Sequence, residues 1–223
     1  MHDVRETVRE IQEAFASPAY PAAFLEKYDQ MECLGSHNGV ETFLVRERED
    51  GSLHVAKCYD RSVYEDAGEA DALRQLSHPG LPVFGDAFCN DEMICTVRAY
   101  IEGVPLSECC RSDALTRRQI VDICVALCDV LRYLHERPQP VIHRDIKPEN
   151  VILRPDGTPV LIDFDTARLY KGNADADTRF FGTKGYAPPE QYGFAETDAR
   201  ADIYSLGVLR RYLLTGSARP NAN

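Results

Sequence analysis

The sequence lacks any long apolar run, and this absence limits where the chain can reside. No stretch of its 223 residues approaches the roughly 18 consecutive apolar residues that a membrane-spanning helix needs. The opening segment, MHDVRETVRE, also lacks the apolar core of a secretory signal. We therefore expect a cytoplasmic chain that does not enter a membrane.

Positive charge is in short supply as well. The 25 Lys and Arg residues are outnumbered by 36 Asp and Glu residues, which gives a formal net charge of −11. A protein of that charge repels a phosphate backbone at long range. The composition therefore argues against nucleic acid as a partner.

Cysteine is present, but not in a pattern that builds a site. The 8 cysteines include no Cys-x-x-Cys pair and no spacing with histidine that is typical of metal ligands. Cys124 and Cys128 lie four residues apart on an expected helix, so they could in principle bind a metal or form a crosslink. Small buried thiols kept reduced in the cytosol are the far commoner case, and we favour that interpretation, also for adjacent Cys109 and Cys110.

Apolar material, by contrast, is sufficient for a core. Hydrophobic residues make up 44% of the chain and charged residues 27%, as in an ordinary globular protein. The length indicates one or two domains.

The most informative stretch is VIHRDIKPENVIL, residues 141–153. Two short apolar runs flank a polar loop with more charge than a buried turn tolerates without a ligand. Asp145, Lys147 and Asn150 supply a carboxylate, an ammonium and an amide oxygen. Together these groups could orient a hydroxyl, neutralise phosphate charge and bind a hard cation. The loop resembles the catalytic loop of the eukaryotic-type Ser/Thr protein kinases, which also occur in bacteria, at every diagnostic position.

Two later segments extend this resemblance. Residues 161–165, LIDFD, resemble the metal-binding DFG segment with Asp165 in place of Gly, and this implies that Asp163 is a metal ligand. Losing that Gly removes backbone freedom, so a flip to an inactive state should be harder. Residues 182–190, GTKGYAPPE, resemble the segment that docks the substrate. The resemblance implies that Thr183 contacts the catalytic Asp and Lys, a mark of Ser/Thr specificity.

The earlier part of the chain resembles the small lobe of the same family. Lys57 ends an expected third strand and corresponds to the lysine that binds nucleotide phosphates; Glu69, on a helix expected over residues 65–76, corresponds to its ion-pair partner. The resemblance assigns the other nucleotide contacts to a group of residues near the adenine and the phosphates: Gly35, Val55, Tyr100, Ile101 and Ile152. Arg98 stands at the back of the nucleotide pocket or, one residue out of register, points outward.

The phosphate-covering loop departs from the family pattern. In LGSHNGV, residues 34–40, only Gly35 occupies one of the three positions where the family has glycine. Asn38-Gly39 is a favoured pair for a tight hairpin turn. We therefore expect a hairpin that still covers nucleotide, with looser phosphate contact and His37 near its tip.

Regulation could involve the segment between the two later motifs. The resemblance implies that a phosphate on residues 166–182 would pair with Arg144 and order the segment. Thr178 is the candidate acceptor, and an exposed Thr without a role is an equal alternative. Asp175 or Asp177 could instead supply a permanent negative charge.

Periodicity predicts four further helices. One occupies the first 27 residues, and a short second helix starts at Pro21. A long helix begins at Thr116, whose Thr-x-x-Gln pattern is a capping box. The last helix spans residues 198–216. Asp202, inside that last apolar helix, would need backbone donors if it is buried, and the resemblance points to those of the 141–153 loop.

These features predict an α+β, two-lobed protein-kinase-like fold. We expect an N-terminal helical extension over residues 1–27, a small antiparallel β-sheet lobe with one helix over 28–100, and a mainly helical large lobe over 101–223. Kinases continue with about three more helices, so the large lobe is incomplete. Either the sequence is truncated, or a second chain or another copy in a homo-oligomer covers the apolar surface.

The predicted function is that of a signalling protein Ser/Thr kinase. It would transfer the γ-phosphoryl group of ATP to a Ser or Thr hydroxyl of a protein substrate, with Mg²⁺, or Mn²⁺ in its place, held by Asn150 and Asp163. One alternative is a pseudokinase, a nucleotide-binding scaffold without turnover, which the glycine-poor loop and Asp165 favour. The other is a small-molecule kinase of related fold, although such enzymes lack the 182–190 segment.

Overall fold

The computed structural model describes residues 20–65, 68–111, 115–169, 183–192 and 197–216. The chain divides into two compact units, Met1–Ala67 with Gly85–Arg98 and Gly68–Phe84 with Ala99–Asn223. Each unit has a hydrophobic core of its own, and the predicted lobe boundaries after residues 27 and 100 stay predictions. No helix in the described ranges combines the length and the apolar character needed to cross a bilayer.

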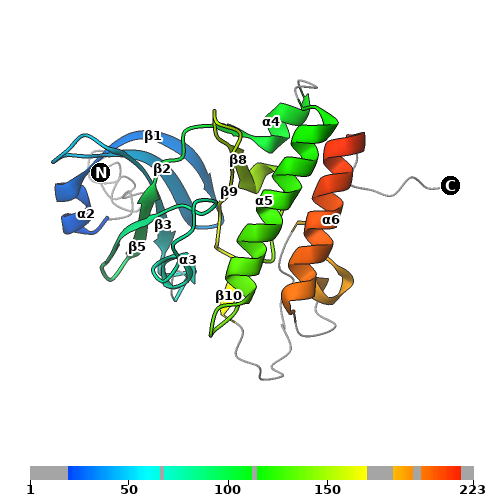
Figure 1. The fold of residues 1–223 in the computed structure, drawn as a ribbon. Helices are drawn as coiled ribbons and strands as arrows, with labels where there is room; N and C mark the ends of the chain where they lie inside the picture. The colour runs from blue at the N-terminus through cyan, green and yellow to red at the C-terminus, as the bar shows by residue number, and fades with distance from the viewer. Residues whose placement is uncertain (1–19, 66–67, 112–114, 170–182, 193–196, 217–223) are drawn as a thin grey trace, which may run out of the picture. The chain divides into compact units, whose positions relative to one another are not determined.

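The first unit is built on a five-stranded antiparallel sheet with strand order β1-β2-β3-β5-β4 (Figure 1). Its strands are β1 (Tyr28–His37), β2 (Val40–Glu47), β3 (Leu53–Asp60), β4 (Phe84–Cys89) and β5 (Met93–Ala99). The predicted tight turn joins the first two strands, because His37 pairs with Val40 and the two residues between them, Asn38 and Gly39, have φ of 50° and 75°. This is the left-handed geometry that an Asn-Gly hairpin turn requires.

One face of this sheet carries the core of the first unit. The short helix expected after Pro21 is present as α2 (Ala22–Lys27), whereas the helix expected before it lies outside the described residues. Phe24 and Tyr28 are fully buried against inward-facing sheet residues, namely Val45, Ala56, Cys58, Met93, Cys95 and Val97. Because side chains alternate along a strand, Lys57 and Arg98 lie on the opposite face of the sheet.

A polar cluster ties α2 to the far edge of the sheet. The Asp86 carboxylate on β4 accepts hydrogen bonds from Lys27 Nζ at 2.9 Å and Tyr28 Oη at 2.5 Å. Burial alone would raise the pKa of Asp86, but the hydrogen bonds from Tyr28 and Lys27 hold that pKa below its usual value. The carboxylate therefore stays ionised and keeps the helix against the sheet.

The second unit is mainly helical. Its helices are α3 (Gly68–Leu73), α4 (Leu106–Arg111), α5 (Arg117–His135) and α6 (Ala199–Thr215). Short strands pair as β6-β8-β9 (Val104–Pro105, Val151–Leu153 and Pro159–Leu161) and as β7-β10 (Val141–Ile142 and Arg168–Leu169). Two 3₁₀ turns, η1 (Pro148–Asn150) and η2 (Pro189–Tyr192), complete the unit. Helices α5 and α6 run side by side (Figure 1).

Local signals explain both long helices. The Thr116 side chain accepts from the Gln119 backbone N–H and the Gln119 side chain accepts from the Thr116 N–H, so the predicted capping box is confirmed. The buried stripe of α5 consists of apolar residues at helical spacing, as the periodicity predicts: Ile120, Ile123, Leu127, Val130, Leu131 and Leu134. Helix α6 begins after Asp198, which caps it, and ends at Gly216 with φ 71°, as predicted.

The helix expected over residues 65–76 is shorter than predicted. Glu65 lies in a bend, and α3 ends at Leu73. Its last turn tightens, because Leu76 N–H donates to Leu73 O at 3.0 Å, and Ser77 N–H donates to the Tyr133 hydroxyl at 2.9 Å. A contact with another helix therefore replaces the helical hydrogen bond at this end, and the apolar period of the sequence overestimates the length of the helix.

Candidate active site

The loop between β7 and β8 is held by a carboxylate from α6. Asp202 is fully buried, and it accepts from His143 N–H at 2.9 Å and from Arg144 N–H at 2.8 Å. His135, at the end of α5, hydrogen-bonds the same carboxylate through Nε2 at 2.8 Å. The backbone-holding role expected for Asp202 is confirmed, whereas His135 is a partner that the sequence did not reveal.

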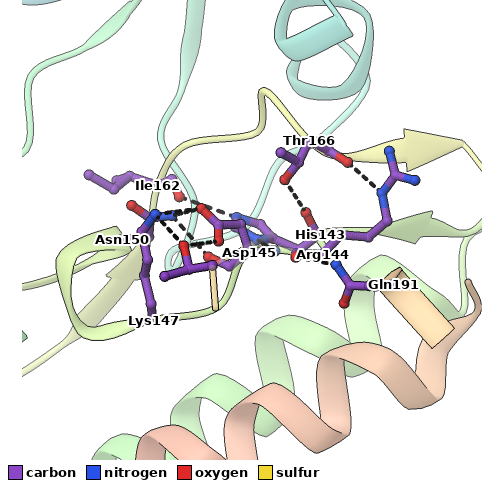
Figure 2. Close-up of polar contacts among 9 residues, drawn as sticks. His143, Arg144, Asp145, Lys147, Asn150, Ile162, Thr166 and Gln191 are labelled. Carbon is purple, nitrogen blue, oxygen red and sulfur yellow. Dashed lines mark hydrogen bonds and ion pairs between the residues drawn. The ribbon is translucent and has the colours of Figure 1, made fainter. Parts of the chain in front are cut away.

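The Asp145 carboxylate lies at the centre of the loop and is 8% exposed (Figure 2). Its Oδ1 accepts from Thr183 Oγ1 at 2.7 Å, and its Oδ2 accepts from Lys147 Nζ at 2.7 Å and Asn150 Nδ2 at 2.9 Å. Lys147 Nζ also donates to Thr183 Oγ1 at 2.9 Å. The structure thus brings three predicted site residues around the carboxylate of a fourth, and one of the three, Thr183, lies 38 residues further along the chain.

His143 supports the loop from the core. It is fully buried, its Nε2 donates to Ile162 O at 3.2 Å, and its Nδ1 accepts from Asp145 N–H at 3.4 Å. Its ring meets the Phe164 ring edge to face, with centroids 4.7 Å apart. Burial lowers the pKa of His143, so the ring stays neutral and both nitrogens serve these contacts. His143 is therefore a core histidine with both ring nitrogens satisfied.

Asp163 lies at the same end of the β8-β9 hairpin as Asn150. Val151 pairs with Leu161, and the next hydrogen bond runs from Ile162 N–H to Asn150 O at 2.9 Å. Asp163 follows directly and has φ 69°, a left-handed conformation that is uncommon for a residue with a Cβ. Such backbone strain is typical of functional sites.

The donor set of this corner suits a hard divalent cation. Asn150 uses Nδ2 to donate to Asp145, which directs its amide oxygen away from that contact, and Asp163 adds a carboxylate. Among the described residues no group of three or more His, Cys, Asp or Glu side chains could enclose a metal ion. Mg²⁺ is commonly bound by one or two protein oxygens together with water and substrate phosphates, so two oxygen ligands fit it.

Arg144 is buried beside the start of the following segment. It is 5% exposed with φ 67°, and its Nε donates to Thr166 O at 2.6 Å, while Thr166 Oγ1 donates to His143 O at 3.1 Å. Thr166 therefore joins the segment to the loop through both of its oxygens. Thr178, the predicted phosphorylation site, lies outside the described residues.

The predicted nucleotide residues divide between the two units. In the first unit, Lys57 and Val55 are buried on one face of β3 and Gly35 is half-buried on β1. Arg98 is 8% exposed on the same sheet face as Lys57, which favours the inward of the two expected registers. In the second unit, Ile101 is buried, whereas Tyr100 is exposed.

Two further residues of that prediction belong to the second unit. Ile152 is half-buried on β8, where it pairs with Pro105. Glu69 lies in α3, and its side chain is outside the described residues.

Gln191, like His135, is a polar residue whose contact the sequence did not predict. It lies on η2, is 1% exposed, and donates from Nε2 to Arg144 O at 2.8 Å (Figure 2). The only available signal was its position directly after the 182–190 segment, and that signal does not say where the side chain points.

A sequence model of the protein kinase domain matches residues 28–221. The chain belongs to the protein kinase family. Its curated relatives include "Serine/threonine-protein kinase D" of Synechocystis, 30% identical over 220 residues that cover 86% of this chain and 41% of the relative. "Serine/threonine-protein kinase PknB" of Mycolicibacterium smegmatis is 28% identical over 88% of this chain and 33% of its own length.

An animal kinase matches as well. Mouse "Serine/threonine-protein kinase Nek1" is 28% identical over 86% of this chain and 16% of its own length. The chain thus spans less than half the length of these curated relatives. Membership of the family implies ATP and a divalent metal.

Proposed function

We propose that the protein transfers the γ-phosphoryl group of ATP to a Ser or Thr hydroxyl of a protein substrate. The observation that carries this proposal is the environment of Asp145, whose carboxylate accepts three side-chain hydrogen bonds, one of them from a threonine hydroxyl. A carboxylate fixed in this way can orient an incoming hydroxyl and accept its proton as the phosphoryl group is transferred.

Lys147 stabilises the negative charge at the reacting group. Its ammonium lies 2.7 Å from Asp145 and 2.9 Å from Thr183 Oγ1, so it is fixed on both sides before substrate arrives. A preorganised cation in a largely buried site stabilises developing charge without reorganising during the reaction. Thr183 tethers the docking segment to the same carboxylate, which favours Ser/Thr over Tyr acceptors.

The remaining predicted residues hold the nucleotide and the metal. Asn150 and Asp163 would bind Mg²⁺, or Mn²⁺ in its place, and the metal would neutralise phosphate charge when bound. Lys57, with Glu69 as its partner, would bind the nucleotide phosphates. Gly35, Val55, Tyr100, Ile101 and Ile152 would surround the rest of the nucleotide, and Arg144 would receive a phosphate on Thr178.

Radiolabelled phosphoryl transfer with Mg²⁺-ATP tests this assignment. We expect wild type to label a generic acceptor such as myelin basic protein. Asp145→Asn should lose labelling by at least about a hundredfold, since general base catalysis alone contributes that much. Asp163→Asn should also lose labelling, because it removes the charged ligand proposed for the metal. Asp129→Asn, at an exposed position on α5, is the matched control and should retain wild-type labelling.

The same assay separates the proposal from its alternatives. Equal labelling by wild type and both site variants would eliminate the mechanism. Absence of labelling in wild type, with ATP binding retained in a direct binding measurement, would instead identify a scaffold without turnover.

A further inference from the structure

The Arg144 backbone has a strained conformation that its own sequence does not favour. Its φ of 67° lies in the left-handed region, where a residue with a long side chain is rarely found. Such a conformation persists only where surrounding contacts hold it. Because the Arg144 carbonyl belongs to the peptide bond that leads to Asp145, this conformation also sets the direction in which the Asp145 backbone leaves.

Two contacts hold this residue from opposite sides. Its N–H donates to Asp202 Oδ1 at 2.8 Å, and its carbonyl accepts from Gln191 Nε2 at 2.8 Å. The Gln191 amide orientation is fixed chemically, since the opposite orientation would place an oxygen against the carbonyl oxygen. With 1% exposure, Gln191 cannot exchange this contact for one to bulk water.

Gln191 also comes from the segment that contacts the catalytic carboxylate. Thr183, eight residues earlier, donates to Asp145 Oδ1 at 2.7 Å. Within the same segment, the Tyr186 carbonyl accepts from Ser205 Oγ on α6 at 3.0 Å, and Gln191 N–H donates to Pro188 O at 3.1 Å. The segment therefore reaches the catalytic loop at two points, one on the Asp145 side chain and one on the peptide preceding it.

We propose that Gln191 is a positioning residue for the phosphoryl transfer, which fixes the Arg144-Asp145 peptide and thereby aims the Asp145 carboxylate. This inference rests on the proposed function. It predicts that the docked position of the 183–192 segment and the geometry of Asp145 are coupled through this one hydrogen bond. Gln191 itself need not touch the substrate.

Three variants isolate the hydrogen bond. Gln191→Glu keeps the shape but loses the donor at neutral pH, and Gln191→Met keeps the length without any donor or acceptor of comparable strength. Gln139→Glu, at an exposed site after α5, makes the same chemical change elsewhere and serves as the control. All are assayed with Mg²⁺-ATP and myelin basic protein, and their folding is checked by far-UV circular dichroism.

The expected kinetic result is a loss in kcat rather than in ATP binding. For Gln191→Glu and Gln191→Met at pH 8 we expect kcat to fall about tenfold, as loss of a buried hydrogen bond permits. The KM for ATP should stay within about twofold of wild type, since a positioning residue does not contact nucleotide. A wild-type kcat for folded Gln191→Met would overturn the inference.

A pH profile distinguishes positioning from a general structural defect. Once protonated, the carboxyl introduced by Gln191→Glu can donate to the Arg144 carbonyl again. Burial at this 1% exposed position raises the pKa of the introduced carboxyl above that of a free Glu, so the ratio of its kcat to that of wild type should rise at least about threefold between pH 8 and pH 6. The ratio for Gln191→Met should stay flat. Asp145, Asp202 and His135, the ionisable side chains near this contact, are common to all variants, so their effects cancel in the ratio. A flat ratio for Gln191→Glu would refute the role.

Hydrogen exchange provides a readout that does not need catalysis. Backbone amides of residues 143–147 should exchange several-fold faster in Gln191→Met than in wild type or Gln139→Glu at one pH, because the loop loses an anchor. If the wild-type protein transferred no phosphoryl group, the proposed function would be contradicted. If amide exchange in this loop were also unchanged in Gln191→Met, the role of Gln191 would be overturned as well.

Discussion

Removing the Asp202 carboxylate should lower the stability of the helical unit. We expect a larger loss than from removing any other described polar side chain that holds the loop between β7 and β8. Asp202 is fully buried and satisfies two backbone N–H groups, those of His143 and Arg144, together with His135 Nε2. Asp202→Ala leaves all three donors without this acceptor. Each buried donor left unsatisfied costs about 1–3 kcal/mol.

The expected size of the effect follows from partial relaxation of these groups. His135 is 13% exposed and can turn to water, whereas the two backbone donors are buried. We therefore expect a loss of about 2–5 kcal/mol in the free energy of unfolding. For a chain of this length, 1 kcal/mol shifts Tm by roughly 2–4 °C, so the melting temperature should fall by about 5–15 °C.

Far-UV circular dichroism at 222 nm is the suitable assay, because the helices lie mainly in the second unit. The control is Asp198→Ala, which removes an N-cap carboxylate from the same helix and should cost only about 1 kcal/mol. If Asp202→Ala melted within about 2 °C of this control, the loop would not depend on the buried carboxylate, and the reasoning above would be wrong.

Three further predictions concern the rest of the molecule. In the sheet unit, the pKa of Asp86 is lower in the folded than in the unfolded state, so its stabilising contribution is complete above about pH 4 and disappears as pH falls. Urea titrations at several pH values should therefore show the stability difference between wild type and Asp86→Asn shrinking on acidification. A constant difference would contradict this prediction. Gly103→Ala should cost about 2–4 kcal/mol in urea unfolding, because φ is 155° and the new Cβ would clash with the Leu153 backbone oxygen. An equal loss for Gly157→Ala, where φ is 86° and the Cβ meets no atom within 4 Å, would contradict this. His37→Gly should strengthen ATP binding about fivefold in calorimetry by admitting one more backbone hydrogen bond, and an unchanged Kd would refute loop coverage of the nucleotide.

The elements that the sequence predicted well are those with local causes. The capping box at Thr116, the apolar stripe of α5, the Asn38-Gly39 turn and the Gly216 helix end depend on residues within a few positions of each other. Their geometry follows from short-range hydrogen bonding and side-chain period, so a single sequence carries enough information. The resemblance to the kinase family then supplied the identity of the site residues.

Contacts between distant segments account for what was missed. Helix α3 stops early where Ser77 N–H binds the hydroxyl of Tyr133, 56 residues away, and no local residue signals that stop. Helix α4, six residues long, was not expected at all, because an isolated helix of that length has too few hydrogen bonds to form without tertiary packing. Leu106, at its start, is fully buried in the core of the second unit.

Backbone strain shows where these distant contacts matter most. Among the described residues, three that are not glycine have positive φ: Asn38, Arg144 and Asp163. Asn38 lies in a turn that requires this conformation, and Asn adopts it at low cost, so no distant contact is needed. For Arg144 and Asp163 the neighbouring sequence offers no such reason, and both flank the carboxylate and amide oxygens proposed to act on the phosphoryl group.

Asp202 from α6 and Gln191 from η2 hold Arg144 in its strained conformation, and both lie more than forty residues after it in the sequence. The conformation of this loop therefore depends on contacts with segments that are distant in the sequence. Removing either anchor should let φ of Arg144 relax toward negative values and turn the Asp145 carboxylate away from Thr183. Phosphoryl transfer should then be lost before nucleotide binding, since the residues proposed to bind phosphate, such as Lys57, belong to the other unit.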